Sequence, residues 1–474
     1  MNTIKFGTSG WRGIIAEDFT FEGVRIVTQS IADYLKTCGE DKKGVVVGYD
    51  ARFLGNRFAV EVVKILAGNG IKSFLTKGPT PTPVIAFEIM RRKAGGGINI
   101  TASHNPHEYS GLKFSSFSGE PALPAVTREI EKRANEMLLE VVYSEFSVAK
   151  ARQKNLLEEI EPFLYYAEGH KQKVDISIIE KAKLEIGVDL MYGAGCGYLD
   201  RILKSAGCTI NVFHDHIDPC FGGRPPDPSE ENLSMLIRAV KENGYDLGLA
   251  LDGDADRFGI IDRDGTFIEP NYILAMLFDY MVRVKGLSGG VARSVATSHL
   301  VDAVAKHYNA PVYETPVGFK YIGELITTGK ILIGGEESAG LSIRGHVPEK
   351  DGMLTCLLVT EMVAREGKNL KELLNDLYKR VGRLVTKREN VQLDNASGKM
   401  LSQMLNKPPK TIAGLSVKDV KDVGGVKFLL EHGCWLLIRE SGTEPVVRLY
   451  GEARGEDELE RLMKAGRELV LGGV

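Results

Sequence analysis

Short apolar runs alternate along this sequence with helical patterns of about a dozen residues. Residues 45–47 form one such run, residues 58–67 follow with a helical pattern, and residues 71–76 again resemble a strand. Strands separated by helices predict βαβ units, and therefore a parallel sheet. Because a single core rarely grows beyond about 300 residues, a chain of 474 residues is expected to divide this architecture among several domains.

The alternation restarts twice. The second set predicts strands at 184–192, 209–213 and 247–251 around a helix at 198–205, and the third predicts segments at 294–297, 301–307, 312–314 and 331–333. Charged helical stretches at 129–139 and 361–381 are interpreted as connecting segments. From about residue 385, strands at 434–439 and 446–450 precede a helix at 456–470, which predicts a smaller α+β domain.

Composition excludes several classes of protein. Lys and Arg total 60 against 63 for Asp and Glu, a net charge of −3, which argues against binding nucleic acid through bulk positive charge. No apolar run approaches the ~18 residues of a membrane span, and the first residues lack a signal-peptide pattern. The six cysteines form no CxxC pair, as expected of reduced thiols. We therefore expect a cytoplasmic protein without nucleic-acid or membrane partners.

The first candidate site is the loop Thr101-Ala102-Ser103-His104-Asn105-Pro106, which follows a predicted strand at 98–100. We expect an exposed and reachable Ser103 hydroxyl, a weak nucleophile until a base, metal or cationic field activates it. His104 is a poor base for it, because neighbouring side chains diverge. No GxSxG elbow surrounds the serine, which counts against an α/β-hydrolase. The alternative is a Ser/Asn turn with structural hydrogen bonds.

The second site is the run Asp252-Gly253-Asp254-Ala255-Asp256-Arg257 between two apolar strands. Three carboxylates at every second position can converge on one hard cation, and oxygen ligands favour Mg²⁺. An EF-hand would need Gly and Glu where Arg257 and Arg263 stand, so that motif is excluded. The alternative is a solvated acidic turn. Its buried setting argues for a metal, because three unpaired carboxylates repel.

Two further loops hold residues that can bind a substrate. The run Gly334–Gly340 holds Glu336 and Ser338, which can grip adjacent sugar hydroxyls, although a flexible turn is the simpler interpretation. Downstream, Lys350 is flanked by acids and can act in proton transfer, or it is an ordinary surface charge. The run Arg439–Pro445, followed by Arg448, gathers guanidinium, hydroxyl and backbone N–H donors as a phosphate cradle would, the alternative being a hairpin turn.

Together these loops resemble the α-D-phosphohexomutase family. The resemblance runs from Gly7-Thr8-Ser9-Gly10-Trp11-Arg12-Gly13 to the Arg439–Arg448 loop, so it covers almost the whole chain. It implies an α/β fold: three related α/β mixed-sheet domains and a smaller C-terminal α+β domain around a central cleft. We expect these domains at 1–150, 151–259, 260–374 and 375–474.

The resemblance also implies roles for single residues. It makes Ser103 the carrier of the phosphoryl group and a member of a Mg²⁺ shell with Asp252, Asp254 and Asp256. The other residues it makes catalytic are Lys113, Arg257, Lys350, Arg12 and His104. The residues it assigns to substrate binding are Glu336, Ser338, Gly318, Arg439, Ser441, Gly442, Thr443 and Arg448.

The expected reaction interconverts hexose 1-phosphate and hexose 6-phosphate through glucose 1,6-bisphosphate or its analogue. Phosphomannomutase-like and phosphoglucosamine mutase-like members commonly have histidine where Gly340 stands, and the runs Glu314–Lys320 and Glu349–Gly352 look more like phosphoglucomutases. Glucose phosphate is therefore the first expectation and mannose phosphate the second. A phosphoglucosamine mutase, a metal-dependent phosphatase and a silent sugar-phosphate sensor remain alternatives. The expected assembly is a monomer or homodimer.

Overall fold

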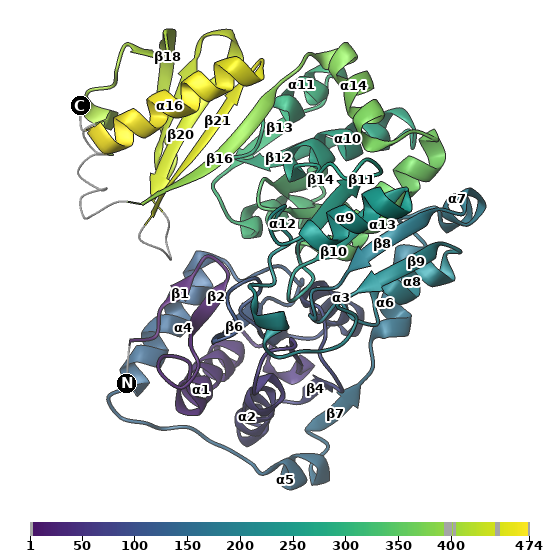
Figure 1. The fold of residues 1–474 in the computed structure, drawn as a ribbon. Helices are drawn as coiled ribbons and strands as arrows, with labels where there is room; N and C mark the ends of the chain where they lie inside the picture. Colours follow the sequence, from purple (N-terminus) through teal and green to yellow (C-terminus); the bar gives the residue numbers. More distant parts are fainter. Residues whose placement is uncertain (1–2, 393–400, 402–403, 441–445, 473–474) are drawn as a thin grey trace.

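The computed structural model describes residues 3–392, 401, 404–440 and 446–472, and within them the strands form four sheets (Figure 1). Three sheets combine parallel strands with an antiparallel edge, and the fourth, nearest the C-terminus, is antiparallel. The expected three α/β mixed-sheet domains and smaller C-terminal α+β domain are therefore confirmed. No helix among the described residues is long and apolar enough to cross a membrane.

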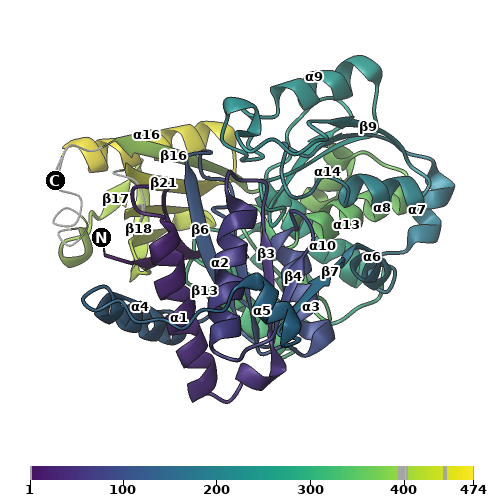
Figure 2. The same cartoon turned by 90° about the horizontal axis from the view of Figure 1, so that it is seen from below.

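The first sheet has the strand order β1-β2-β6-β5-β3-β4-β7. Its strands are β1 (Phe6–Gly7), β2 (Gly10–Ile14), β3 (Val45–Tyr49), β4 (Ser73–Thr76), β5 (Gly96–Ile100), β6 (Tyr109–Ser115) and β7 (Leu157–Ile160). Its helices are α1 (Phe21–Thr37), α2 (Gly55–Gly68), α3 (Thr82–Arg92), α4 (Pro124–Met137) and α5 (Val148–Gln153). Figures 1 and 2 show α1 and α4 side by side, and the two helices are in contact.

Alternation along β3 explains why helices cover both faces of this sheet. Successive side chains of a strand point to opposite faces. Val45 and Val47 therefore pack in one core with α1 and α2, whereas Val46 packs with Ile85 and Ile89 of α3 on the other face. A strand buried on both faces has an unbroken apolar sequence, which is what residues 45–47 are.

The second and third sheets share one large core. The second has the order β11-β10-β8-β9 and the third β13-β12-β14-β15. The strands are β8 (Glu185–Asp189), β9 (Thr209–Phe213), β10 (Leu247–Leu251), β11 (Phe258–Asp262), β12 (Gly290–Ser294), β13 (Val312–Thr315), β14 (Ile331–Glu336) and β15 (Gly340–Ile343). The helices around them are α6 (Phe163–His170), α7 (Ile176–Ala182), α8 (Leu199–Ser205), α9 (Ser234–Asn243), α10 (Pro270–Arg283), α11 (Leu300–His307), α12 (Phe319–Thr327), α13 (Gly352–Glu366) and α14 (Leu370–Val381).

Several expected segments differ from the structure. The strand expected at 294–297 ends at Ser294, because Thr297 turns back to hydrogen-bond its backbone N–H to Ser294. The stretch 361–381 is no simple connection: Glu361 lies in α13, whose residues 352–363 are buried between the second and third sheets. The strand β7 pairs with β4, so residues 157–160 extend the first sheet beyond the expected boundary at 150. Likewise β11 crosses the expected boundary at 259, and α14 crosses that at 374.

The fourth sheet has the order β16-β21-β20-β19-β18-β17 and is covered by α16 (Glu456–Gly472). Its strands are β16 (Val385–Gln392), β17 (Thr411–Ile412), β18 (Leu415–Asp422), β19 (Val426–Leu430), β20 (Trp435–Glu440) and β21 (Val446–Ala453). Short 3-10 turns elsewhere in the described chain lie at Asp41–Lys43, Phe221–Gly223 and Glu431–Gly433.

A buried polar contact joins the fourth sheet to the third. Glu452 accepts hydrogen bonds from Trp435 Nε1 (2.7 Å), from the backbone N–H of His299 (3.0 Å) and from the Ser298 hydroxyl. Lys427 Nζ donates to Val295 O (2.6 Å) and lies 4.2 Å from the centre of the Trp435 ring. Because the Glu452 carboxylate is buried and accepts from both sides, it helps to hold the C-terminal sheet against the third sheet.

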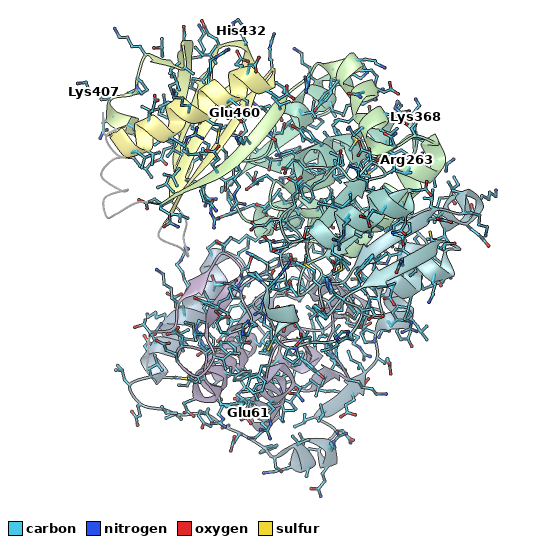
Figure 3. All side chains as sticks on the ribbon, in the orientation of Figure 1. Glu61, Arg263, Lys368, Lys407, His432 and Glu460 are labelled. Carbon is cyan, nitrogen blue, oxygen red and sulfur yellow. The ribbon has the colours of Figure 1, made fainter. Side chains whose placement is uncertain are left out.

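We predict that Glu452→Ala weakens this docking. The change leaves the indole N–H and the His299 N–H without their acceptor, at a cost of about 2–4 kcal/mol in the free energy of unfolding. Urea unfolding followed by fluorescence measures it, because Trp435 is one of two tryptophans. The matched control is Glu460→Ala on the exposed side of α16 (Figure 3), which should change stability by less than about 0.5 kcal/mol. Equal effects of the two variants would contradict this account.

Candidate active site

Three of the predicted loops occupy equivalent places in the three mixed sheets. Each joins a parallel strand to the antiparallel strand beside it: residues 101–108 join β5 to β6, residues 252–257 join β10 to β11, and residues 337–339 join β14 to β15. Polar residues therefore gather at the carboxyl ends of the parallel strands, where sites in open α/β sheets form.

The Ser103 loop is held in a defined conformation by a buried arginine. Arg52 donates from Nη2 to Ser103 O (2.7 Å) and Asn105 O (2.6 Å), and from Nη1 to Pro106 O (2.6 Å) and Tyr109 O (2.9 Å). Ser103 itself has a φ of 54°, a left-handed conformation that is uncommon for a residue with a side chain. Such strain is found where the surrounding structure fixes a functional residue.

The Ser103 hydroxyl is buried, which differs from the exposed hydroxyl we expected. Its residue is only 1% exposed, because the Asp252–Arg257 loop of the second sheet covers it. A Cβ added at Gly253 would lie 2.7 Å from Ser103 O, so only glycine allows this approach. The serine Oγ donates a hydrogen bond of 2.8 Å to Asp252 Oδ2. The first and second predicted motifs thus meet directly.

The three aspartates of the second loop converge as their spacing predicts. Ligand oxygens of Asp252, Asp254 and Asp256 lie within 4.8 Å of one another, and all three residues are buried. Asp254 Oδ1 and Asp256 Oδ1 are buried and have no hydrogen-bond partner. Buried oxygens that converge without partners fit a hard cation such as Mg²⁺.

Two lysines from outside the second sheet pair with Asp254 and Asp256. Lys113 Nζ of β6 donates to Asp254 Oδ2 (2.6 Å) and Asp256 Oδ2 (2.9 Å), and Lys350 Nζ lies 3.1 Å from Asp256 Oδ2 and 2.7 Å from Glu349 Oε1. The structure therefore brings both candidate acid/base lysines to the metal loop. Lys350 is no ordinary surface charge, because it is buried.

Burial and neighbouring charges separate the pKa values in this cluster. Burial raises the pKa of Asp252 well above its usual range, and Asp254 and Asp256 add to the shift. Burial would also raise the pKa of Asp256, but Lys113 and Lys350 outweigh it and hold that pKa low. Burial lowers the pKa of Lys350, yet Asp256 and Glu349 more than reverse the effect, so the ammonium keeps its proton.

Arg12, His104 and Arg257 surround the serine. Arg12 Nη1 donates to Asn105 Oδ1 (2.5 Å), and Arg257 Nη1 lies 3.9 Å from Asp227 Oδ1, while Arg257 Nε is buried without a hydrogen-bond partner. His104 Nδ1 lies 3.4 Å from Ser103 Oγ, so the expectation that these neighbouring side chains diverge is wrong. The left-handed backbone at Ser103 turns both side chains to one side. Burial, then Arg257 and Arg12, lower the pKa of His104, which keeps the ring neutral.

The third loop presents Glu336 beside Gly318. Glu336 is buried and accepts a 2.8 Å hydrogen bond at Oε1 from the backbone N–H of Gly318, whose φ is 126°. Ser338 is half-buried in the same loop. A Cβ at Gly340 would lie 2.5 Å from Cδ of Lys350, so the missing side chain at this position makes room for the stem of the lysine.

The fourth predicted motif is described only in part. Ser441, Gly442 and Thr443 lie outside the described residues. Arg439 of β20 and Arg448 of β21 are direct cross-strand partners, and Arg439 Nε is buried without a hydrogen-bond partner. Two guanidinium groups on directly opposed residues offer donors of the kind that a phosphate binds. Both stand on the C-terminal sheet, apart from the sheets that carry the other site residues.

Two residues at the site were missed from the sequence. Arg52 organises the serine loop, and Thr82 donates its hydroxyl to Asp254 Oδ2 and its backbone N–H to Asp254 O (2.9 Å). The polar pair Asp50 and Arg52 directly after an apolar strand was a signal for the first. No local pattern indicated the second.

A serine on a strained backbone places its hydroxyl against carboxylates that suit Mg²⁺, and lysines and arginines surround them. These are the components of phosphoryl transfer. The residues come from successive α/β units, and an arginine pair stands on the fourth sheet. This combination fits the class of enzymes that transfer phosphoryl groups.

Comparison with family models gives the particular family. Models of the phosphoglucomutase/phosphomannomutase family match α/β/α domain I at residues 3–139, domain II at 165–265, domain III at 269–381 and the C-terminal domain at 390–469. The chain belongs to this family, as its four motifs led us to expect.

Individual relatives agree along the full length. A phosphoglucomutase/phosphomannomutase of Thermococcus kodakarensis is 33% identical, over 98% of both chains. A phosphoglucosamine mutase of Methanococcus maripaludis is 32% identical, over 91% of this chain and 93% of the relative. A crystal structure of a protein assigned to the phosphomannomutases, from Thermus thermophilus, superposes with a TM-score of 0.86, at 33% identity over 99% of both chains.

We predict that Glu336 makes stability fall as pH rises. Burial, and then the charge of Glu337, raise the pKa of Glu336 from 4.5 to about 7. Between these values the folded protein holds a proton that the unfolded chain has released, so folding is favoured at the lower pH. Glu336→Gln should remove up to about 3 kcal/mol of the stability difference between pH 5 and pH 8.

Urea unfolding at both pH values tests this, with Glu324→Gln on the exposed side of α12 as the control. If Glu336→Gln and the wild type show the same pH dependence, Glu336 is ionised in the folded protein.

Proposed function

We propose that this enzyme interconverts hexose 1-phosphate and hexose 6-phosphate through a phosphoserine at Ser103 and a hexose 1,6-bisphosphate intermediate. Glucose phosphate is the first substrate and mannose phosphate the second. The observation that carries the proposal is the 2.8 Å contact of Ser103 Oγ with Asp252, inside a cluster of carboxylates and lysines. A phosphoryl group on Oγ would stand where anions are neutralised from several sides.

The groups that would hold Mg²⁺ are Asp252, Asp254, Asp256 and the phosphoryl group of Ser103. When bound, the ion would supply positive charge against the oxygens of the transferred phosphoryl group. The unpartnered oxygens of Asp254 and Asp256 support this assignment.

The chain's own residues would carry the proton and hold the charge. In the first half-reaction the bond between Ser103 Oγ and phosphorus breaks, and a bond forms from phosphorus to the free hydroxyl of the sugar. Oγ gains a proton and the sugar hydroxyl loses one. Lys350 and Lys113 are the acid/base candidates, and both ammonium groups lie at the cluster. Arg12, Arg257 and neutral His104 would stabilise the charge that develops on the transferred phosphoryl group. After the bisphosphate reorients within the site, the second half-reaction returns its other phosphoryl group to Ser103.

Recognition of the substrate would be divided between the third and fourth sheets. Glu336 and Ser338, with the backbone at Gly318, would bind sugar hydroxyls. Arg439 and Arg448, with the loop of Ser441, Gly442 and Thr443, would bind the phosphate that does not react. Because either end of the bisphosphate comes to this cradle in turn, the cradle has to recognise a dianion rather than a particular carbon atom.

Glucosamine phosphate is the main alternative to glucose phosphate, because it is supported by the names of several relatives. Some relatives are named phosphoglucosamine mutases, such as that of Methanococcus maripaludis. Competing glucose, mannose and glucosamine 1-phosphates in one assay would rank the three. Release of inorganic phosphate instead would support a sugar phosphatase. The six cysteines are free, which supports a cytoplasmic enzyme. The proposed assembly is a monomer or homodimer around one cleft, activated by glucose 1,6-bisphosphate.

We predict that Ser103→Ala abolishes mutase activity, lowering kcat by at least about 10⁴-fold, because the phosphoryl group loses its carrier. The assay converts α-glucose 1-phosphate to glucose 6-phosphate with Mg²⁺ and a trace of glucose 1,6-bisphosphate. Ser110→Ala is the matched control: this serine is buried nearby on β6, and its hydroxyl has no hydrogen-bond partner. Full activity of Ser103→Ala would overturn the phosphoserine mechanism.

We predict that Arg439→Gln raises KM for the sugar phosphate by about 10-fold or more, through the loss of a charge-assisted hydrogen bond to phosphate. Steady-state kinetics measures this, with the exposed Arg454→Gln of the same domain as the control. A KM equal to that of the wild type would show that Arg439 does not bind the phosphate.

A further inference from the structure

We propose that His170, His346 and Asp351 form a second cation site, which takes a late first-row transition metal such as Zn²⁺. The site is separate from the Asp252–Asp256 loop, and the proposed mechanism uses none of these three side chains. The inference stands whether or not the proposed sugar is correct.

The three residues come from two segments that lie far apart in the chain. His170 is the last residue of α6, His346 lies between β15 and α13, and Asp351 is the N-cap of α13. All three are buried, and one ligand atom from each lies within 4.8 Å of the others. His346 Nε2 is 2.7 Å from Asp351 Oδ2, His170 Nε2 is 3.9 Å from the same oxygen, and the two imidazole rings are 5.2 Å apart.

His170 supplies the independent observation that points to a ligand. Its Nε2 is buried without a hydrogen-bond partner, while its Nδ1 lies 2.9 Å from the backbone oxygen of Tyr166. A carbonyl oxygen only accepts, so Nδ1 carries the proton and Nε2 presents a lone pair toward Asp351. His170 Nε2 and Asp351 Oδ2 are therefore two acceptors 3.9 Å apart in a buried site, and a cation between them would satisfy both. Oδ2 also accepts a hydrogen bond of 2.7 Å from His346 Nε2, so a metal bound by His346 through this nitrogen would displace that proton. Burial lowers the pKa of His170 to about 4, so the imidazole stays neutral and able to bind a metal.

The residues behind the three ligands have the arrangement that metal sites use. An imidazole that binds through one nitrogen generally donates its other N–H to a carbonyl or carboxylate, as His170 does to Tyr166. Asp351 is oriented in turn: Oδ2 accepts from the Tyr166 hydroxyl (2.6 Å), and Oδ1 accepts from the backbone N–H of Leu354 (2.9 Å). Both His170 and Asp351 are therefore positioned by other groups.

The ligand set selects the ion. Mg²⁺ and Ca²⁺ prefer oxygen ligands, which the Asp252–Asp256 loop offers. Two imidazoles and one carboxylate suit Zn²⁺, Co²⁺ and their neighbours, and leave a fourth position for water. The two sites of this chain are therefore expected to take different metals.

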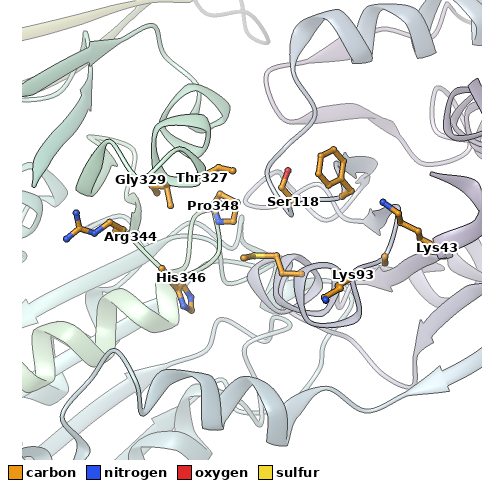
Figure 4. A pocket seen from close by; sticks show the side chains of 13 residues that line it. Lys43, Lys93, Ser118, Thr327, Gly329, Arg344, His346 and Pro348 are labelled. Carbon is orange, nitrogen blue, oxygen red and sulfur yellow. The ribbon is translucent and has the colours of Figure 1, made fainter. Parts of the chain in front are cut away.

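One of the three residues also meets a cavity. His346 lines a cavity of about 520 Å³ between the first and third domains. Figure 4 shows His346 near Arg344 and Pro348, on the side of the cavity away from Lys43 and Lys93. Because Asp351 follows Lys350, an ion held here would fix the segment that carries this lysine, and it would tie that segment to α6.

The experiment uses the full-length protein, stripped with a chelator and then dialysed in excess Mg²⁺ to fill the proposed site of the Asp252–Asp256 loop. Zn²⁺ bound per chain is measured by elemental analysis after equilibrium dialysis, and Co²⁺ is added separately as a spectroscopic probe. We expect about one Zn²⁺ per chain and the intense visible absorption of Co²⁺ bound by nitrogen ligands in a site of low coordination number. His170→Gln should weaken Zn²⁺ binding by more than about 100-fold, since even outer-shell partners contribute 10–100-fold.

Two controls separate this site from other causes. His216→Gln changes an exposed histidine and should leave Zn²⁺ binding unchanged. Asp254→Asn disables the loop proposed for Mg²⁺ and should still bind Zn²⁺, so the metal count does not depend on mutase activity. Absence of Zn²⁺ from the wild type, or equal binding by His170→Gln, would leave a hydrogen-bonded cluster only and overturn the proposal. If His170→Gln does not fold, the Co²⁺ spectrum of the wild type decides in the same way.

Discussion

The site depends on the neutralisation of two buried carboxylates, Asp254 and Asp256, by lysines from outside the second sheet, while Asp252 accepts a hydrogen bond from Ser103. Asp252, Asp254 and Asp256 belong to the second sheet, whereas Lys113 comes from the first and Lys350 follows the third. A buried charge without a partner costs several kcal/mol, and much of that cost returns only when the geometry is good. The docking of the three sheets therefore determines which carboxylates of the site can stay ionised. The hydrogen bond from Ser103 to Asp252 has its length because the sheets are held at this spacing.

The repeated architecture explains why one site draws on several domains. Each mixed sheet ends its parallel run with a strand that turns back, and the loop at that turn stands at the same edge. Once three such sheets pack with these edges together, each contributes one short loop. The chemistry of each loop can then be fixed independently: a hydroxyl at 103, carboxylates at 252–256, and a carboxylate at 336 beside the backbone of Gly318.

Local sequence was enough for the parts of the site that are local. The Asp252–Asp256 spacing predicts convergence because three carboxylates at every second position of one short loop lie close together whatever the rest of the fold. Strands such as 209–213 and 247–251 were predicted with the bounds that the structure has. Long-range features were not predictable. Arg52, Thr82 and His170 matter through partners more than 50 residues away, and no spacing rule connects them. The burial of Ser103 was missed for the same reason, since the loop that covers it belongs to another sheet.

The separation of the partners along the chain has a consequence for folding during synthesis. Lys113 precedes Asp254 by 141 residues, and Ser103 precedes Asp252 by 149. The first sheet therefore leaves the ribosome well before the carboxylates that it meets, and until then its lysine and serine stay in water. Contacts of such long range form late, because the intervening chain has to be ordered first. A nascent or truncated chain can therefore hold an intact first domain while the contacts of Ser103 with Asp252 and of Lys113 with Asp254 are still missing.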